Sequence, residues 1–178
     1  RLAYLSGDFN NTAVASLIAG VFEHHDRDRF EAIAVSFTES DGSDMRARLM
    51  RSFGRFVEVW NVSDAEVATF LRHNETDIAI DLMGFTGNGR PGILALRPAP
   101  IQVSHLGFPG TMGAEHIDYL LADSTVIPKD NWNDYDEAVV ELPDCFMPTD
   151  SERRIAHSKP SRAEAGLPAD GFVFCSFN

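Results

Sequence analysis

The stretch DIAIDLMGFTGNGRPGILALRPAPIQVSHLGFPGT, residues 77–111, decides the fold of this chain. It begins with a short apolar run around Ile80 that is typical of a strand buried inside a sheet. It ends with IQVSHLGFPGT, a second short strand that runs into a Gly/Pro turn. Between the two strands, Pro91 can begin a helix and Pro98 must end it. Strand, helix and strand in this order predict one βαβ unit.

The same alternation continues on both sides of this unit. Further strands are predicted at 2–6, 32–37, 56–60, 118–122, 139–142 and 172–177. Helices are predicted at 14–22, 45–53 and 63–71, with a short one at 161–166. Asn11 or Thr12 can cap the first of these helices. We therefore expect a Rossmann-like, three-layer α/β domain, in which helices cover both faces of a mainly parallel sheet.

The composition argues against two classes of partner. Of the 178 residues, 44% are hydrophobic and 24% charged, and the net charge is −12. A nucleic-acid interface needs clustered positive charge, and a membrane-spanning helix needs about 20 apolar residues in a row. We therefore expect no nucleic acid and no membrane as partner. No signal peptide is expected, because Arg1 leads directly into a strand pattern. Both ends interrupt such a pattern, which indicates a domain excised from a longer protein.

Several reactive or charged side chains have an ordinary structural interpretation. Cys145 and Cys175 fit no metal-binding spacing, so we expect buried free thiols in a reducing cytoplasm, and a disulfide between them stays open. His24 and His25 fall in the last turn of a predicted helix, where cations are favourable, and the nearby sequence offers no further metal ligands. A solvated helix face is predicted for three arginines that lie away from the apolar stripe, Arg46, Arg48 and Arg51.

Residues 87–92, GNGRPG, match the dinucleotide-binding pattern G-x-G-x-x-G only literally. That fingerprint needs its first glycine directly after a strand, an open helix N-terminus and an acidic residue about 20 positions on. Here four residues intervene after Leu82, Pro91 occupies the helix start, and no fitting acid follows near Met112. A flexible loop before a proline-started helix is the better interpretation.

Polar side chains follow three predicted strands, at the edge where open α/β sheets bind their ligands. Asp8 follows the first strand, Thr86 the strand around Ile80, and His105 the strand that begins at Ile101. A carboxylate, a hydroxyl and an imidazole could therefore converge there. His105 fits three roles, as a base, as a hydrogen-bond donor to a ligand, or as a packed structural histidine.

Motifs along the whole chain resemble those of one family. They are SGDF at 6–9, RPAPIQV at 97–103, LGFPGT at 106–111, IDY at 117–119 and FCSFN at 174–178. Together they resemble the O-linked N-acetylglucosamine transferase family, which includes the plant Spindly proteins and bacterial relatives with tetratricopeptide repeats. The similarity spans nearly the whole chain, and the second and third motifs are highly specific.

The resemblance implies the first half of a GT-B glycosyltransferase, in which two Rossmann-like domains face each other across a cleft. Residues 1–178 are then the N-terminal catalytic domain, with 147–178 as linker and start of the second half, and the fragment alone is expected to be inactive. Family members transfer a sugar to Ser or Thr hydroxyls with inversion, here expected to be N-acetylglucosamine from UDP-GlcNAc. No metal and no cofactor is expected. The expected partners are the sugar nucleotide, a protein or peptide acceptor, the second catalytic half and tetratricopeptide repeats, in the cytoplasm.

The resemblance also implies the site residues. Its catalytic candidates are Asp8 and His105. The residues expected to contact the donor sugar and the acceptor are Asn11, Thr12, Leu106, Gly107, Pro109, Gly110 and Thr111. Glycines allow close backbone approach, and a proline stiffens the turn, so that little ordering entropy is lost on binding.

Three positions depart from the family pattern. A common histidine is replaced by Thr12, and histidines of some members are replaced by Ser16 and Phe85. Threonine cannot act as a general base near neutral pH, so His105 is offered as a partial substitute. Two alternatives stay open: a degenerate, non-catalytic sugar-nucleotide or peptide-binding module, and another GT-B chemistry such as nucleotide-sugar epimerisation. The donor stays open between UDP-GlcNAc and GDP-fucose.

Overall fold

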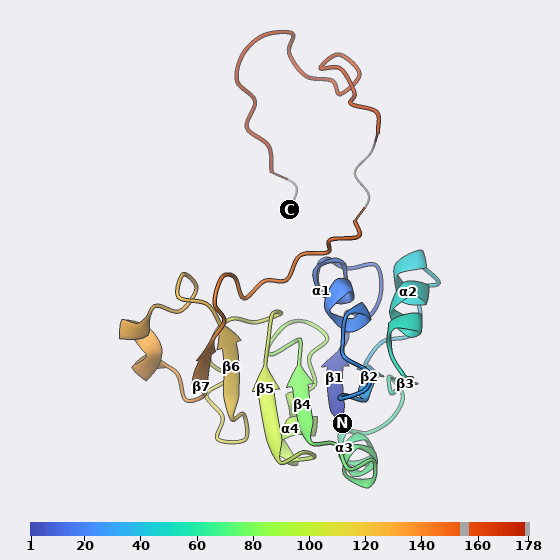
Figure 1. The fold of residues 1–178 in the computed structure, drawn as a ribbon, viewed down its shortest axis with the longest axis vertical. Helices are drawn as coiled ribbons and strands as arrows, with labels where there is room; N and C mark the ends of the chain where they lie inside the picture. Colours follow the sequence, from blue (N-terminus) through green and yellow to red (C-terminus); the bar gives the residue numbers. More distant parts are fainter. Residues whose placement is uncertain (154–156, 177–178) are drawn as a thin grey trace.

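The computed structural model describes residues 1–153 and 157–176. Within this range seven strands form one sheet in the order β3-β2-β1-β4-β5-β6-β7 (Figure 1). Every neighbouring pair runs parallel. The predicted parallel sheet is confirmed, and the order in which the chain adds strands reverses between β1 and β4.

The strands and helices follow the predicted order closely. The strands are β1 (Leu2–Ser6), β2 (Ala32–Ser36), β3 (Arg55–Glu58), β4 (Ile78–Asp81), β5 (Ile101–Ser104), β6 (Tyr119–Ala122) and β7 (Ala138–Glu141). The helices are α1 (Ala13–Glu23), α2 (Asp44–Ser52), α3 (Asp64–His73), α4 (Pro91–Ala95) and the 3₁₀ helix η1 (Lys129–Asp134). No helix within the described residues has the length and apolar character that crossing a membrane requires.

Helices cover both faces of the sheet and bury two apolar clusters. On one face α1 and α2 pack against Leu2 and Tyr4 of β1, with Ile18 at the centre of the helical side. On the other face α3 and α4 pack against Ala3 and Leu5. Strand β1 thus sends alternate residues to opposite faces, and the expected three layers are confirmed.

The helices begin at the capping residues that the sequence contains. Thr12 caps α1, where its hydroxyl accepts a backbone N–H of the first turn at 3.2 Å. Ser63 and Glu66 form the capping box of α3. Pro91 opens α4, and that helix ends before Pro98. The predicted βαβ unit of β4, α4 and β5 is therefore confirmed.

The short helix predicted at 161–166 is wrong. Residues 162–166 form turns, although Glu164 Oε2 accepts from both N and Oγ of Ser161 at 2.8 Å, as in a capping box. Capping bonds alone do not sustain a helix, because most helical stability in proteins comes from packing an apolar face.

The strand predicted at 172–177 is also wrong over its described part. Residues 172–176 have no neighbouring strand, and residue 177 lies outside the described residues. Phe172 and Phe174 are 84% and 91% exposed. An apolar run becomes a strand only where a neighbour pairs with its backbone and a layer covers its side chains.

Two side-chain interpretations are corrected as well. Arg46 is only 1% exposed and Arg48 is held in ion pairs, whereas Arg51 faces solvent as expected. Helix α2 lies beside α1 and over β2 and β3, so the side of α2 that bears no apolar stripe still contacts protein. Cys145 and Cys175 are free thiols, but both are exposed rather than buried.

Candidate functional site

The loops that follow β1, β4 and β5 lie side by side at the carboxyl edge of the sheet (Figure 1). They comprise residues 7–12, 83–89 and 105–113. Strands β1 and β4 pair directly although β2 and β3 come between them along the chain. In doubly wound sheets, ligands bind in the crevice at such a reversal of strand order. The topology therefore places the candidate site between the first two of these loops.

Asp8 supplies a carboxylate beside this reversal of strand order. Its N–H donates to Ser6 Oγ at 2.9 Å and its carbonyl accepts from Thr12 Oγ1 at 2.9 Å, which fixes the backbone around it. Within the described residues, no donor bonds the Asp8 carboxylate, and partial burial raises its pKa above the usual range for aspartate. A half-buried carboxylate with open acceptor oxygens can orient a ligand hydroxyl or accept its proton.

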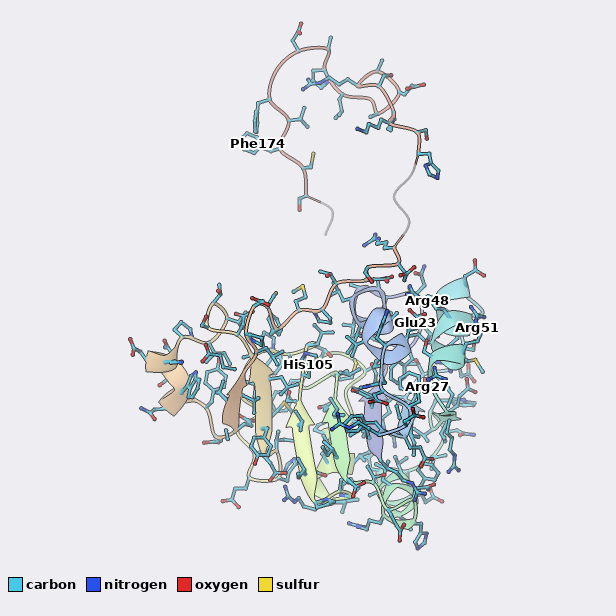
Figure 2. All side chains as sticks on the ribbon, viewed as in Figure 1. Glu23, Arg27, Arg48, Arg51, His105 and Phe174 are labelled. Atoms are coloured by element: carbon cyan, nitrogen blue, oxygen red, sulfur yellow. The ribbon has the colours of Figure 1, made fainter. Side chains whose placement is uncertain are left out.

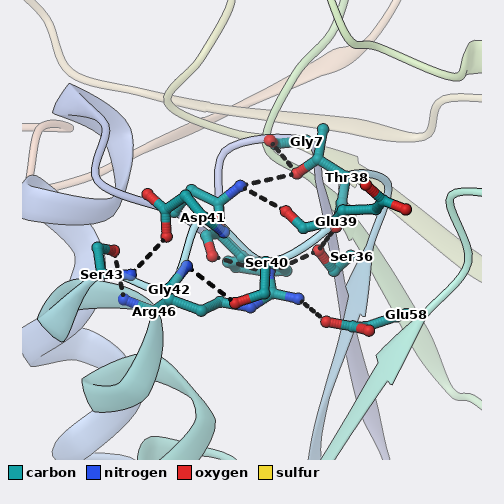
Figure 3. Close-up of polar contacts among 12 residues, drawn as sticks. Gly7, Ser36, Thr38, Glu39, Ser40, Asp41, Gly42, Ser43, Arg46 and Glu58 are labelled. Carbon is teal, nitrogen blue, oxygen red and sulfur yellow. Dashed lines mark hydrogen bonds and ion pairs between the residues drawn. The ribbon is translucent and has the colours of Figure 1, made fainter.

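The loop 7–12 is held in place by the loop that follows β2 (Figure 3). Asn10 Nδ2 donates to Thr38 Oγ1 at 3.2 Å, and Asn10 Oδ1 accepts from Asp41 N at 3.3 Å. Asp41 Oδ2 accepts from Asn11 N at 2.8 Å, and this bond is the largest cause that holds the pKa of Asp41 below its usual range. Local sequence patterns do not reveal these bonds, because the bonds join segments far apart in the chain.

Beneath this loop, the buried Arg46 of α2 ties three elements together. Its Nη1 donates to Phe9 O and to Ser36 Oγ, both at 2.8 Å, and its Nη2 pairs with Glu58 (Figure 3). Its guanidinium carbon lies 4.4 Å from the centre of the Phe56 ring, a cation–π contact. A buried guanidinium is costly unless its donors are bonded. Arg46 therefore fixes the backbone next to Asp8.

Two of the predicted sugar-contact residues sit at the entrance of α1. The hydroxyl of Thr12 donates to Asp8 O at 2.9 Å and accepts from Ala15 N at 3.2 Å, so its proton is used by the loop and one of its lone pairs by the helix cap. Asn11 is exposed, and none of the described residues bonds its side chain. Of this pair, Asn11 has the polar atoms that a ligand could reach.

The loop after β4 is anchored by Asp81, which sequence analysis missed. Asp81 is 4% exposed, and its two oxygens accept from Met83 N and Gly84 N, each at 3.0 Å. Burial raises the pKa of Asp81, and the two bonds oppose that rise. An acid that ends an apolar strand three residues before a glycine is a signal for such an Asx turn.

The exposed Phe85 of this loop forms an aromatic pair with Phe108 of the loop after β5. Phe85 is 60% exposed, and its ring meets that of Phe108 edge-on, with the centres 5.5 Å apart. Gly84 has φ +55°, and a Cβ there would lie 2.5 Å from the Cβ of Phe108, so the turn needs glycine. The pair links the loop after β4 to the loop after β5.

His105 is buried and has a structural partner. Its Nε2 lies 3.1 Å from Phe146 O, and because a carbonyl only accepts, that nitrogen carries the proton. Burial lowers the pKa of His105, and the bond to Phe146 O opposes that shift. The ring, labelled in Figure 2, lines an apolar groove of about 350 Å³ with Tyr4 and Ile80, on the face of the sheet that α1 covers.

The three strand-end residues are therefore not joined into one constellation. The hydroxyl of Thr86 donates to Met83 O at 2.7 Å, within its own loop. Among the described residues, no hydrogen bond connects Asp8, Thr86 and His105 to one another. A catalytic role for His105 stays a prediction, and the ring would first have to give up its hydrogen bond to Phe146 O.

Close backbone packing shapes the turn 106–111. A Cβ at Gly107 would lie 2.0 Å from Leu82 O, so only glycine fits. Leu106 has φ +71°, and Gly107 N donates to His105 O at 2.9 Å, which makes a strained three-residue turn. The side chain of Leu106 is buried in the core, so the backbone is what this residue can present to a ligand.

The end of this turn is clamped by Glu137, another residue that sequence analysis missed. Glu137 is 3% exposed and accepts from Thr111 Oγ1 and Met112 N, both at 2.7 Å. Gly110 and Thr111 border a hollow of about 400 Å³ beside η1, and Pro109 is exposed. The predicted contact residues thus form two groups, one at the crevice and one toward η1.

His24 and His25, predicted in the last turn of a helix, lie just past it, because α1 ends at Glu23 and His24 is its C-cap. His24 Nδ1 lies 2.7 Å from Gly20 O, and His25 Nε2 lies 2.8 Å from Tyr4 Oη. In residues 1–153 and 157–176, no group of three or more His, Cys, Asp or Glu side chains is placed to hold a metal ion.

Comparisons with known proteins point to one family. The family model described as Glycosyl transferase family 41 matches residues 1–160. The probable UDP-N-acetylglucosamine--peptide N-acetylglucosaminyltransferase SEC of Arabidopsis thaliana is 37% identical over 183 residues, which cover 100% of this chain and 19% of that protein. The UDP-N-acetylglucosamine--peptide N-acetylglucosaminyltransferase of Caenorhabditis elegans is 32% identical, over 88% of this chain and 14% of that protein.

A solved structure gives the same result for the fold. A mutant O-GlcNAc transferase of Thermobaculum terrenum superposes with a TM-score of 0.80 and 32% sequence identity. The match covers 83% of this chain and 28% of that one. The chain thus corresponds to part of that protein, and it spans about a fifth or less of the curated relatives named above.

Proposed function

The chain belongs to glycosyl transferase family 41, and we propose that it is part of a protein O-glycosyltransferase that acts on Ser and Thr hydroxyls. The observation that carries the proposal is the 37% identity to SEC along the entire chain. The names of the relatives favour N-acetylglucosamine as the transferred sugar and UDP-GlcNAc as its donor. GDP-fucose is the competing donor, and the assay below distinguishes the two.

The chemistry assigned to this domain is acceptor activation. In an inverting transfer, the hydroxyl oxygen bonds to the anomeric carbon as the bond to the nucleotide diphosphate breaks on the opposite face, and the hydroxyl proton passes to a base. Asp8 is the candidate base, because its carboxylate is unbonded within the described residues and its raised pKa favours proton uptake. The backbone of the turn 106–111 and the side chain of Asn11 are proposed to contact the sugar and the acceptor.

The remaining parts of the transferase are proposed to lie outside this domain. A second Rossmann-like half would bind most of the nucleotide, and tetratricopeptide repeats would precede the first half. Because half of the cleft is then missing, the 178 residues alone are expected to be inactive. We expect a cytoplasmic protein that needs no metal or other cofactor for the transfer.

A non-catalytic binding module of the same fold is the second candidate. It is favoured by one observation: position 12, where relatives commonly carry a histidine, holds a threonine whose hydroxyl is used by the helix cap. Such a module would bind the sugar nucleotide or a peptide without transfer. Both candidates require the crevice beside Asp8, so binding alone does not separate them.

The test is a transfer assay on the full-length protein with UDP-GlcNAc and GDP-fucose, each with a set of Ser/Thr peptides. Transfer from UDP-GlcNAc that falls by about 100-fold or more in Asp8→Asn supports the proposal, since general base catalysis contributes about 10²–10⁴-fold. Asp28→Asn, which changes an exposed carboxylate outside the site, is the matched control.

Calorimetry with the same donors decides the alternatives. Donor binding without transfer, followed by transfer once Thr12→His is introduced, establishes the binding module. Binding and transfer with GDP-fucose alone corrects the donor. No binding of either donor refutes the proposed function.

A further inference from the structure

The chain does not leave the domain where its last strand ends. After β7, residues 143–150, which we call the strap, run back across the carboxyl edge of the sheet toward α1 and α2 (Figure 1). Strand β7 is the outermost strand on one side, whereas α1 and α2 pack over the strands on the other side. The strap therefore moves the exit point of the chain from one side of the sheet to the other.

The first anchor of the strap is Phe146. Its N–H donates to Asp123 Oδ2 at 2.8 Å, and its carbonyl accepts from His105 Nε2 at 3.1 Å. The ring is 8% exposed and belongs to the apolar cluster under α1. Both backbone groups and the side chain of this residue are thus bonded or buried at the ends of β5 and β6.

The second anchor is an ion-pair triad in which Asp150 of the strap meets Arg48 of α2 and Glu23 of α1, the last two labelled in Figure 2. Arg48 Nη1 and Nη2 donate to the two carboxylate oxygens of Asp150 at 2.6 and 3.1 Å. The same guanidinium donates through Nε and Nη2 to Glu23 of α1 at 2.8 and 2.7 Å. Every nitrogen of Arg48 is therefore bonded to a carboxylate, and paired two-point contacts of this kind are the strong, geometry-specific ones.

Burial makes this triad different from an ordinary surface pair. The side chain of Asp150 is only 4% exposed, and those of Arg48 and Glu23 are 23% and 29% exposed. A carboxylate that is removed from water is costly without its cation, so Asp150 strongly prefers the docked position to an unpaired one. Asp150 Oδ1 also accepts from Glu152 N at 3.0 Å, so the hydrogen-bonded part of the chain extends two residues beyond Asp150.

From these contacts we propose that Arg48 is a positioning residue that locks the strap, so that the chain beyond Asp150 leaves the domain beside α1 and α2. The lock rests on contacts within the chain and does not depend on sugar transfer. For the two-part transferase proposed above, it would fix the point from which the second half is placed against the crevice. Transfer geometry tolerates little displacement, so this exit point would matter for the rate.

Hydrogen–deuterium exchange on the full-length protein tests the lock. The variants are Arg48→Met, which keeps the apolar stem and removes the charge, Asp150→Ala, and the two combined. Losing charge-assisted hydrogen bonds should speed exchange in peptides that cover residues 144–152 by about tenfold or more. The double variant should exchange no faster than the faster single one, because the two changes remove the same interaction.

Arg51→Met is the matched control, since Arg51 lies on the same helix but is exposed. It should leave the exchange of the strap unchanged. Acceleration confined to 144–152 in Arg48→Met and Asp150→Ala supports the lock. Unchanged exchange in residues 144–152 overturns the proposed lock. An equal acceleration in β1 and β4 also overturns it, because the ion pair would then support only the global stability of the domain. If Arg48→Met does not fold, Asp150→Ala decides alone, because Asp150 lies outside every helix and strand.

Discussion

Replacing Arg46 by methionine should destabilise the domain, because this buried arginine is the hub beneath the loop of Asp8. The variant keeps a flexible apolar side chain of similar length but removes every donor. Phe9 O loses its bond from Arg46, whereas Ser36 Oγ loses the bond that it accepts but still donates to Thr38 O at 3.0 Å. Each buried polar group left without its partner costs about 1–3 kcal/mol.

Other contributions are smaller and partly cancel. The side chain of Glu58 is 42% exposed, so water can solvate this carboxylate when its cation is gone. The lost contact with the Phe56 ring costs about 0.5–2 kcal/mol, while methionine recovers apolar packing in the same space. The expected loss is therefore about 3 kcal/mol in the free energy of unfolding. For a domain of this size, that corresponds to a melting temperature lower by roughly 6–12 °C.

Urea denaturation followed by circular dichroism measures this loss directly. Arg51→Met, on the exposed side of the same helix, should stay within about 0.5 kcal/mol of the wild type. Hydrogen exchange in the loop 7–12 should accelerate in the Arg46 variant, since Phe9 O is part of that loop. A loss below about 0.5 kcal/mol for Arg46→Met would falsify the assignment of Arg46 as the hub.

Three further predictions concern the helix cap, the clamp and the triad. Thr12→Ala should destabilise the domain by about 1 kcal/mol in urea denaturation, because α1 loses its N-cap, and Thr12→Ser should restore most of it; equal stability of all three proteins would contradict the cap. Glu137→Gln should reduce kcat/KM of the full-length protein by about tenfold or more and speed exchange at Met112, because the two donors bond different carboxylate oxygens and an amide replaces one of these by a nitrogen that cannot accept. Wild-type values for both would exclude the clamp. Arg48 holds the pKa values of the Glu23 and Asp150 carboxyls below their usual range in the folded protein. The stability that these two carboxylates contribute is therefore fully present above their pKa values in the unfolded chain, which are near 4. It is lost as the pH falls through their lower pKa values in the folded protein. The difference in unfolding free energy between wild type and Asp150→Ala should accordingly shrink between pH 7 and pH 3, and a constant difference would show that charge pairing adds nothing.

Local sequence patterns predicted most of the strands and helices of the fold. Short apolar runs located each of the seven strands found within the described residues, and Ser63 and Pro91 marked the helix starts where they occur. Periodicity and capping are properties of neighbouring residues, so a sequence shows them directly. The two elements that failed, at 161–166 and 172–176, have local signals but nothing in the described chain that covers them.

The candidate site was predicted less completely. The positions of Asp8 and of the turn 106–111 follow from strand ends and from the family motifs. The use of the Thr12 hydroxyl in a cap, and the burial of the Leu106 side chain, emerge only from the packed structure. A motif identifies which residues belong to a loop, and the surrounding contacts decide which atoms remain free for a ligand.

The sequence by itself determined the parallel α/β architecture, the order of its elements and the family. Only the tertiary structure decided that Arg46 is buried, that Glu137 clamps Thr111, and that Asp150 docks on Arg48. These partners lie on different elements, and the last pair is separated by 102 residues along the chain. A polar side chain carries no periodic signal of its own partner, because that partner depends on which distant element the sheet order brings beside it.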